Sequence, residues 1–180
     1  MKKQMVTLAL VAIGLVSFQQ LNAQEFPKLD VSPMDAASFP SNWREADKMV
    51  KVVYSRPQLK KRTLEKLAPA GKVWRTGANE AAEITFYKDV LFGDKEVKKG
   101  TYTLFTIPGD KTWTVILSNQ MNVWGSYFYK EEMDVVRIEA PVQEANDTIE
   151  AFSIVFEGED DNATMHMGWA NTIVSVPVKG

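Results

Sequence analysis

Residues 72–80, with the sequence KVWRTGANE, bring four chemically versatile side chains together in a short run. Trp74 could stack on a sugar or another flat ring, and the Arg75 guanidinium could hold a carboxylate or phosphate by its fork of donors. Asn79 and Glu80 would add hydrogen-bond donors and acceptors. The run follows neither a helical nor a strand period, so we predict an irregular segment that contributes to a binding site.

Two further polar and aromatic segments could join this run. Residues 54–57 end a predicted strand and contain Arg56, and residues 124–127 contain Trp124. We expect the three segments to meet at one edge of a sheet and to bind a small anionic or carbohydrate ligand. The predicted ligand-binding residues are Arg56, Trp74, Arg75, Asn79, Glu80 and Trp124.

A purely structural interpretation of the same residues stays open. Arg75 and Glu80 could form an internal ion pair, with Gly77 permitting a tight turn between them. Trp74 and Trp124 would then fill the core, and the buried polar groups would specify the fold without binding a ligand.

Several kinds of site are excluded by composition. The chain has no Cys and one His, His166, so a zinc site or a thiol nucleophile is not expected, and we predict no metal and no cofactor. His166 alternates with Met165 and Met167, which is typical of an ordinary strand histidine. Lys72 is followed by Val73, where a phosphate-binding loop needs Ser or Thr.

Carboxylates leave two alternatives open. A hydrolase could pair two acidic side chains across strands, and the candidates are Glu80, Glu83, Glu131, Glu132 and Asp134. The acidic run at residues 157–162 favours a solvated turn over a calcium loop, because it lacks the alternating Asp pattern of such loops.

The N-terminus has the layout of a cleaved secretory signal over residues 1–23. Lys2 and Lys3 precede an apolar run that is too short to span a bilayer, and Ala23 ends the segment. Without Lys2 and Lys3 the formal charge falls from −2 to −4, which argues against nucleic acid as a partner. We therefore expect an exported protein, periplasmic or extracellular, with no membrane span after cleavage and an unknown small molecule or envelope protein as partner.

The remaining chain predicts one all-β domain. Residues 24–46 contain three prolines and little periodicity, so we expect an irregular lead-in anchored by Phe39 and Trp43. Residues 47–180 predict an antiparallel β-sandwich or barrel-like domain with one short helical connection at residues 58–69. Strands are predicted at residues 49–54, 83–87, near Val97, and at 101–107, 112–117, 135–140, 148–156, 163–169 and 172–178.

Four sequence runs resemble those of a family of exported bacterial proteins, domain of unknown function 2911. They are YSRP at residues 54–57, GKVWRTGANE at 71–80, GTYTLFTIP at 100–108 and WTVIL at 113–117. The resemblance extends from about Ser32 over most of the chain and implies an exported, mostly β domain of Gram-negative bacteria of the Bacteroidetes type. It implies no activity or catalytic residues. Lys60-Lys61-Arg62 departs from the Lys-Gly-Arg turn expected in relatives.

Three functional hypotheses follow, and the first is preferred. The protein is an exported binding module for a small anionic or carbohydrate ligand, because charge, compartment and fold permit this without special geometry. The alternatives are a carboxylate-dependent hydrolase and a structural or assembly protein of the cell envelope.

Overall fold

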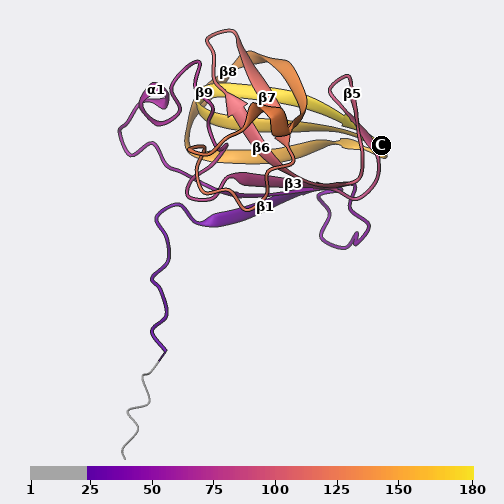
Figure 1. Ribbon diagram of the computed structural model, residues 1–180, viewed down its shortest axis with the longest axis horizontal. Helices are drawn as coiled ribbons and strands as arrows, with labels where there is room; N and C mark the ends of the chain where they lie inside the picture. The colour runs from indigo at the N-terminus through magenta and orange to yellow at the C-terminus, as the bar shows by residue number, and fades with distance from the viewer. Residues whose placement is uncertain (1–23) are drawn as a thin grey trace, which may run out of the picture.

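The computed structural model describes residues 24–180, so the predicted signal at residues 1–23 lies outside the described residues. Within the described residues the chain forms nine strands and two short helical turns, and Figure 1 shows how they are arranged. The elements are β1 (Met34–Phe39), β2 (Val50–Ser55), α1 (Leu64–Leu67), β3 (Ala82–Phe86), β4 (Val90–Phe92), β5 (Lys95–Val97), β6 (Gly100–Ile107), β7 (Thr112–Ser118), the 3-10 turn η1 (Glu131–Met133), β8 (Asp134–Glu159) and β9 (Asn162–Lys179).

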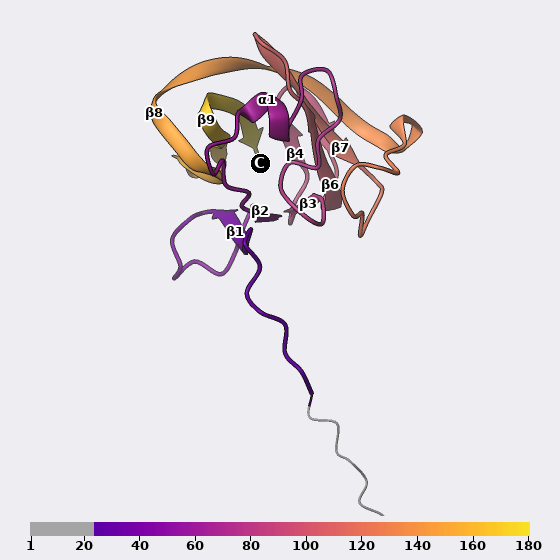
Figure 2. The ribbon, with the colours of Figure 1, turned by 90° about the vertical axis from the view of Figure 1, so that its left-hand side faces the viewer.

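The strands form one antiparallel sheet in the order β1-β2-β3-β6-β7-β8-β9-β4-β5. The sheet curves around a single large hydrophobic core, and β8 arches from one side of the molecule to the other (Figure 2). We call the face toward this core the inner face. The all-β prediction with one short helical connection is confirmed, and the sheet is not closed into a barrel.

The β6–β7 hairpin shows how the sequence dictates local structure. Alternating residues of both strands belong to the large core cluster: Tyr102 and Leu104 on β6, and Trp113, Val115 and Leu117 on β7. At Gly109 in the connecting turn, an added Cβ would lie 2.5 Å from the Thr112 carbonyl oxygen. Only glycine fits there. Because β6 and β7 pair antiparallel on either side of residues 108–111, the predicted turn is confirmed.

Strand β9 reverses direction along its length. A straight strand of 18 residues would be about 60 Å long, yet the Gly180 amide donates to the Asp161 carbonyl oxygen at 2.8 Å. Ala170, with φ of +52°, lies between the two halves. The halves correspond to the strands predicted at residues 163–169 and 172–178, and β8 likewise contains those predicted at 135–140 and 148–156.

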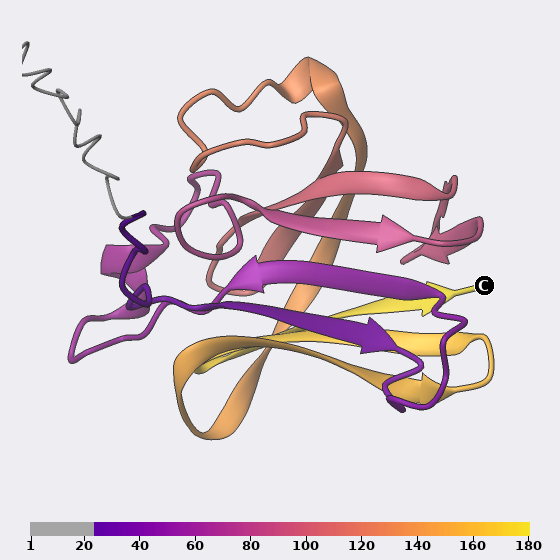
Figure 3. The ribbon, with the colours of Figure 1, turned by 90° about the horizontal axis from the view of Figure 1, so that it is seen from below.

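The structure corrects the sequence prediction at the N-terminal side of the domain. Residues 34–39, expected to be irregular, form β1, which pairs with β2 along its whole length (Figure 3). Phe39 is buried as expected, but Trp43 is 83% exposed and anchors nothing. The strand β4 was not predicted.

The helical connection is shorter than the sequence suggested. The interval between prolines predicted two or three turns, but α1 is a single turn capped by the Thr63 hydroxyl, which accepts from the Lys66 amide. Lys60 and Lys61 have φ of +47° and +65°, a conformation that glycine adopts more readily. The departure from the expected Lys-Gly-Arg turn therefore falls where the backbone would favour glycine.

Candidate functional site

A hollow of about 470 Å³ lies on the outer face of the sheet beside β1, β2 and β3. Its polar lining comes from Ser55 at the end of β2, Glu80, Glu83 on β3, and Asn122. The main-chain amide of Asn122 donates to Glu83 Oε1 at 3.2 Å, which holds this carboxylate in the lining of the hollow. Among residues 24–180, no Lys, Arg or His lines it, so its lining carries negative charge only.

Trp124 forms one rim of the hollow and is 57% exposed. It is held in place through the main chain, because residues 79–81 run antiparallel to residues 123–125. Glu80 and Trp124 form an isolated β-bridge, the Gly125 amide donates to the Asn79 carbonyl oxygen at 2.9 Å, and the Ala81 amide donates to Val123. Met34 of β1, 60% exposed, also lines the hollow.

The run at residues 72–80 leaves the sheet and returns to it. Trp74 pairs with Thr106 of β6 in an antiparallel bridge, and the Ala82 amide at the start of β3 donates to the Arg75 carbonyl oxygen at 3.0 Å. The intervening residues form a loop packed against the end of β2. A Cβ on Gly77 would lie 3.2 Å from the Ser55 carbonyl oxygen, so the close approach favours glycine.

Trp74 belongs to the core and not to the hollow. It is 5% exposed, and its ring stacks on Trp169 with centroids 5.3 Å apart. Phe152 and Trp113 contact it edge to face at 5.0 and 6.1 Å. The alternative that tryptophan fills the core therefore holds for Trp74 and is contradicted for Trp124.

Arg75 points to the outer face, since side chains alternate along an extended chain and Trp74 points inward. The Trp74–Thr106 bridge sets Arg75 opposite Phe105, a member of a small second cluster with Ala81 and Ile116. Within residues 24–180 Arg75 forms no ion pair, and its Nε atom is buried without a hydrogen-bond partner. The internal Arg75–Glu80 ion pair is thus contradicted.

Arg56 joins two distant strands. Its Nε atom donates to the Phe152 carbonyl oxygen at 3.1 Å, and its other nitrogens donate to Ser153 Oγ at 2.6 Å and Asp35 Oδ2 at 3.1 Å. Nearby, the Tyr54 hydroxyl accepts from the Ile154 amide at 2.9 Å. These bonds connect β2 to β8 across the open side of the curved sheet.

The predicted ligand-binding residues therefore separate into three groups. Glu80 and Trp124 meet at the hollow, and Asn79 supports Trp124 through its carbonyl oxygen. Trp74 lies in the core, while Arg56 and Arg75 do not line the hollow. The prediction missed Met34, hidden in an expected lead-in, and Asn122, whose left-handed backbone at φ +57° is typical of a turn asparagine.

The connection between β7 and β8, residues 119–133, carries Trp124 and is extensively hydrogen-bonded. Gln120 accepts from the Lys130 amide at 2.7 Å and donates to the Phe128 carbonyl oxygen at 2.9 Å. Ser126 Oγ donates to the Val73 carbonyl oxygen at 2.8 Å. We call this connection the β7–β8 segment.

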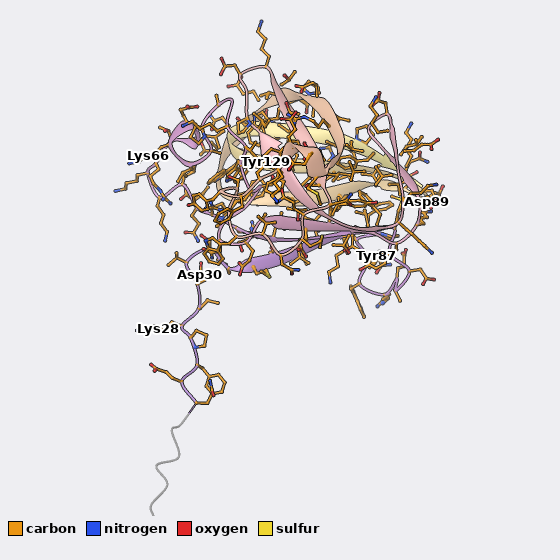
Figure 4. The ribbon with its side chains drawn as sticks, in the orientation of Figure 1. Lys28, Asp30, Lys66, Tyr87, Asp89 and Tyr129 are labelled. Atoms are coloured by element: carbon orange, nitrogen blue, oxygen red, sulfur yellow. The ribbon has the colours of Figure 1, made fainter. Side chains whose placement is uncertain are left out.

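Tyr129, labelled in Figure 4, holds the β7–β8 segment to the sheet. Its ring packs edge to face on Phe105, and its hydroxyl donates to Asp134, whose side chain is 6% exposed. Arg137 donates to both groups at 2.9 and 2.8 Å. Burial, together with the hydrogen bond to the Asp134 carboxylate and its charge, raises the pKa of Tyr129 well above its ordinary value.

The acidic run and His166, which the sequence analysis also considered, do not line the hollow. The acidic run at residues 157–162 spans the end of β8, the turn at residues 160–161 and the first residue of β9. The part of the chain that the structure describes contains no group of three side chains suited to hold a metal. His166 lies on β9 with Nδ1 2.8 Å from Ser175 Oγ. Over residues 24–180 no helix has both the length and the apolar character needed to cross a membrane.

Comparison with known proteins gives one match. The family model described as "Protein of unknown function (DUF2911)" matches residues 32–178. Searches of the curated proteins and of the solved structures found no match to the chain.

Proposed function

Because the chain belongs to the DUF2911 family, whose description assigns no activity, we propose a function from the hollow: the protein is a binding module for a neutral carbohydrate. The supporting observation is an exposed indole, Trp124, at the rim of a hollow whose charged lining within residues 24–180 consists of Glu80 and Glu83. An indole face can pack against the apolar face of a pyranose ring, and carboxylates accept hydrogen bonds from its hydroxyl groups.

The charges of the hollow narrow the ligand class. Glu80 and Glu83 would repel a carboxylate or phosphate, and the two arginines that were expected to bind an anion lie elsewhere. An organic cation is a less suitable ligand than a sugar, because cation-binding cages surround the charge with several exposed aromatic rings. Two aromatic residues line the hollow within residues 24–180, and of these Trp124 is exposed whereas Tyr54 is buried. We therefore place the neutral sugar first.

We also propose that the protein is exported and works in the periplasm or outside the cell. Supporting this is the signal-like layout of residues 1–23. Mass spectrometry of the protein purified from its native cells would test it. Cleavage after Ala23 is expected, and an intact N-terminus on cytoplasmic protein would contradict export.

Isothermal titration with glucose, galactose, mannose and N-acetylglucosamine tests the binding proposal. At least one of these sugars is expected to bind, and Trp124→Ala should weaken binding about tenfold or more, the equivalent of about 1.4 kcal/mol. Trp43→Ala is the matched control, because Trp43 is also exposed but lies outside the hollow. Binding of choline or inorganic phosphate in place of every sugar would overturn the proposal.

Hydrolysis by two carboxylates is the second candidate, because Glu80 and Glu83 line the same hollow. Nitrophenyl glycosides of the sugars that bind provide the test. Release of nitrophenol that is lost in both Glu80→Gln and Glu83→Gln would establish it. Binding without release would leave the protein a binding module.

A further inference from the structure

Besides Trp124, the β7–β8 segment carries exposed aromatic side chains that do not line the hollow. Tyr127 is 77% exposed and Phe128 is 76% exposed, beside the half-exposed Trp124. Exposed aromatic residues gathered in one short segment are typical of recognition surfaces, since burying them elsewhere would stabilise the fold.

These side chains are held on an ordered backbone. Gln120 bonds to residues on the far side of the segment, Ser126 bonds to Val73, and Tyr129 bonds to Asp134. A surface that is already ordered before binding loses little conformational entropy when a ligand arrives. The hydrogen bonds of the segment are therefore consistent with exposed aromatic rings that are held in position before a partner binds.

Gly125 fixes the relation between Tyr127 and Trp124. A Cβ at residue 125 would lie 2.7 Å from Cε2 and 2.8 Å from Cδ2 of Tyr127, so the phenol ring rests directly on the glycine backbone. Gly125 also has φ of +67°, which favours glycine independently. The ring of Tyr127 thus lies against the residue that follows Trp124, beside the hollow that Trp124 lines.

Building on the proposed function, we propose that the carbohydrate is a neutral oligosaccharide, with one unit in the hollow against Trp124 and later units over Tyr127. Residues 125–128 form a turn, and Trp124 and Tyr127 expose two separate aromatic rings on it, on which successive units of a chain of sugars can stack. The acidic lining of the hollow excludes chains rich in uronate, sulfate or phosphate.

The test is a chain-length series by isothermal titration, using cello-oligosaccharides, malto-oligosaccharides and N-acetylglucosamine oligomers of one to six units. For the series that binds, affinity should rise about tenfold or more over the first units, equivalent to about 1.4 kcal/mol, and then level off. Tyr127→Ala should abolish this gain and leave the affinity for the single sugar unchanged. Tyr87→Ala is the control, because Tyr87 is a half-exposed tyrosine at another end of the sheet (Figure 4).

The outcomes separate this inference from the function on which it rests. Binding of a single sugar with no gain in any series would overturn the oligosaccharide inference and leave the carbohydrate proposal standing. A gain that persists in Tyr127→Ala would also overturn it. Failure of every sugar to bind the wild-type protein would overturn both.

Discussion

Trp74 and Trp124 lie in two segments that are hydrogen-bonded to each other, yet they serve opposite sides of the sheet. Trp74 stacks within the core on Trp169, whereas Trp124 stands at the rim of an open hollow. Both segments are rich in polar and aromatic residues and neither is a regular strand. The difference shows that residue type alone does not distinguish a scaffold from a site; the side of the sheet to which a side chain points decides it.

Replacing each tryptophan in turn gives the largest expected contrast. Trp74→Ala should lower the free energy of unfolding by about 3–5 kcal/mol, because it leaves a cavity among three aromatic rings. Trp124→Ala should change it by less than about 0.5 kcal/mol, because half of its side chain is already exposed. Urea unfolding followed by circular dichroism measures both. Equal losses in the two variants would remove the distinction between core and site.

Replacing Arg56 gives the next largest expected effect and tests whether this residue stabilises the fold or binds the ligand. Arg56→Ala removes hydrogen bonds to β8 and should lower the free energy of unfolding by about 1–3 kcal/mol. Arg44→Ala is the control, because Arg44 is exposed and its one aromatic contact in the described residues is with the exposed Trp43 ring. Sugar binding by Arg56→Ala should equal that of the wild type at temperatures where the variant stays folded. A variant that loses sugar binding but keeps the full free energy of unfolding would show that Arg56 belongs to the binding site.

Much of the fold was predictable because its central strands carry the signal in their own residues. The strands β6 and β7 alternate and are rich in β-branched and aromatic residues, and a turn that needs glycine joins them. By contrast, β1 reads MDAASF and has no β-branched residue, so its conformation depends on pairing with β2. Such tertiary pairing overrides local propensity and cannot be inferred from the strand itself.

The candidate site was less predictable for the same reason. Glu80 and Trp124 were predicted from the sequence of their segments. Met34 of β1, which also lines the hollow, was not predicted. The orientation of Trp74 and Arg75 depends on a single β-bridge between Trp74 and Thr106, and no periodic pattern in the sequence predicts that bridge. Arg56 looked like a ligand-binding residue because an exposed guanidinium and one that bonds to a distant strand have the same sequence signature.

Tyr129 offers the smallest effect and tests whether the β7–β8 segment is held rigidly. Folding raises the pKa of Tyr129 through burial and its hydrogen bond to the Asp134 carboxylate, so the native state keeps the phenol protonated where the unfolded chain, with a pKa of about 10, releases the proton. The stability from this interaction is fully present below about pH 10 and is lost as the pH rises toward the higher native pKa.

Tyr129→Phe should therefore be less stable than the wild type by about 0.5–1.5 kcal/mol at pH 7, the usual contribution of one hydrogen bond. The difference should shrink as the pH rises above about 10, because only the wild type loses this contribution. Urea unfolding at pH 7, 9 and 10.5 measures the trend, and Tyr127→Phe provides a control at an exposed tyrosine of the same segment. A difference that stays constant with pH would mean that the Tyr129 hydroxyl does not fasten the segment, and the ordered aromatic surface beside Trp124 would then need another explanation.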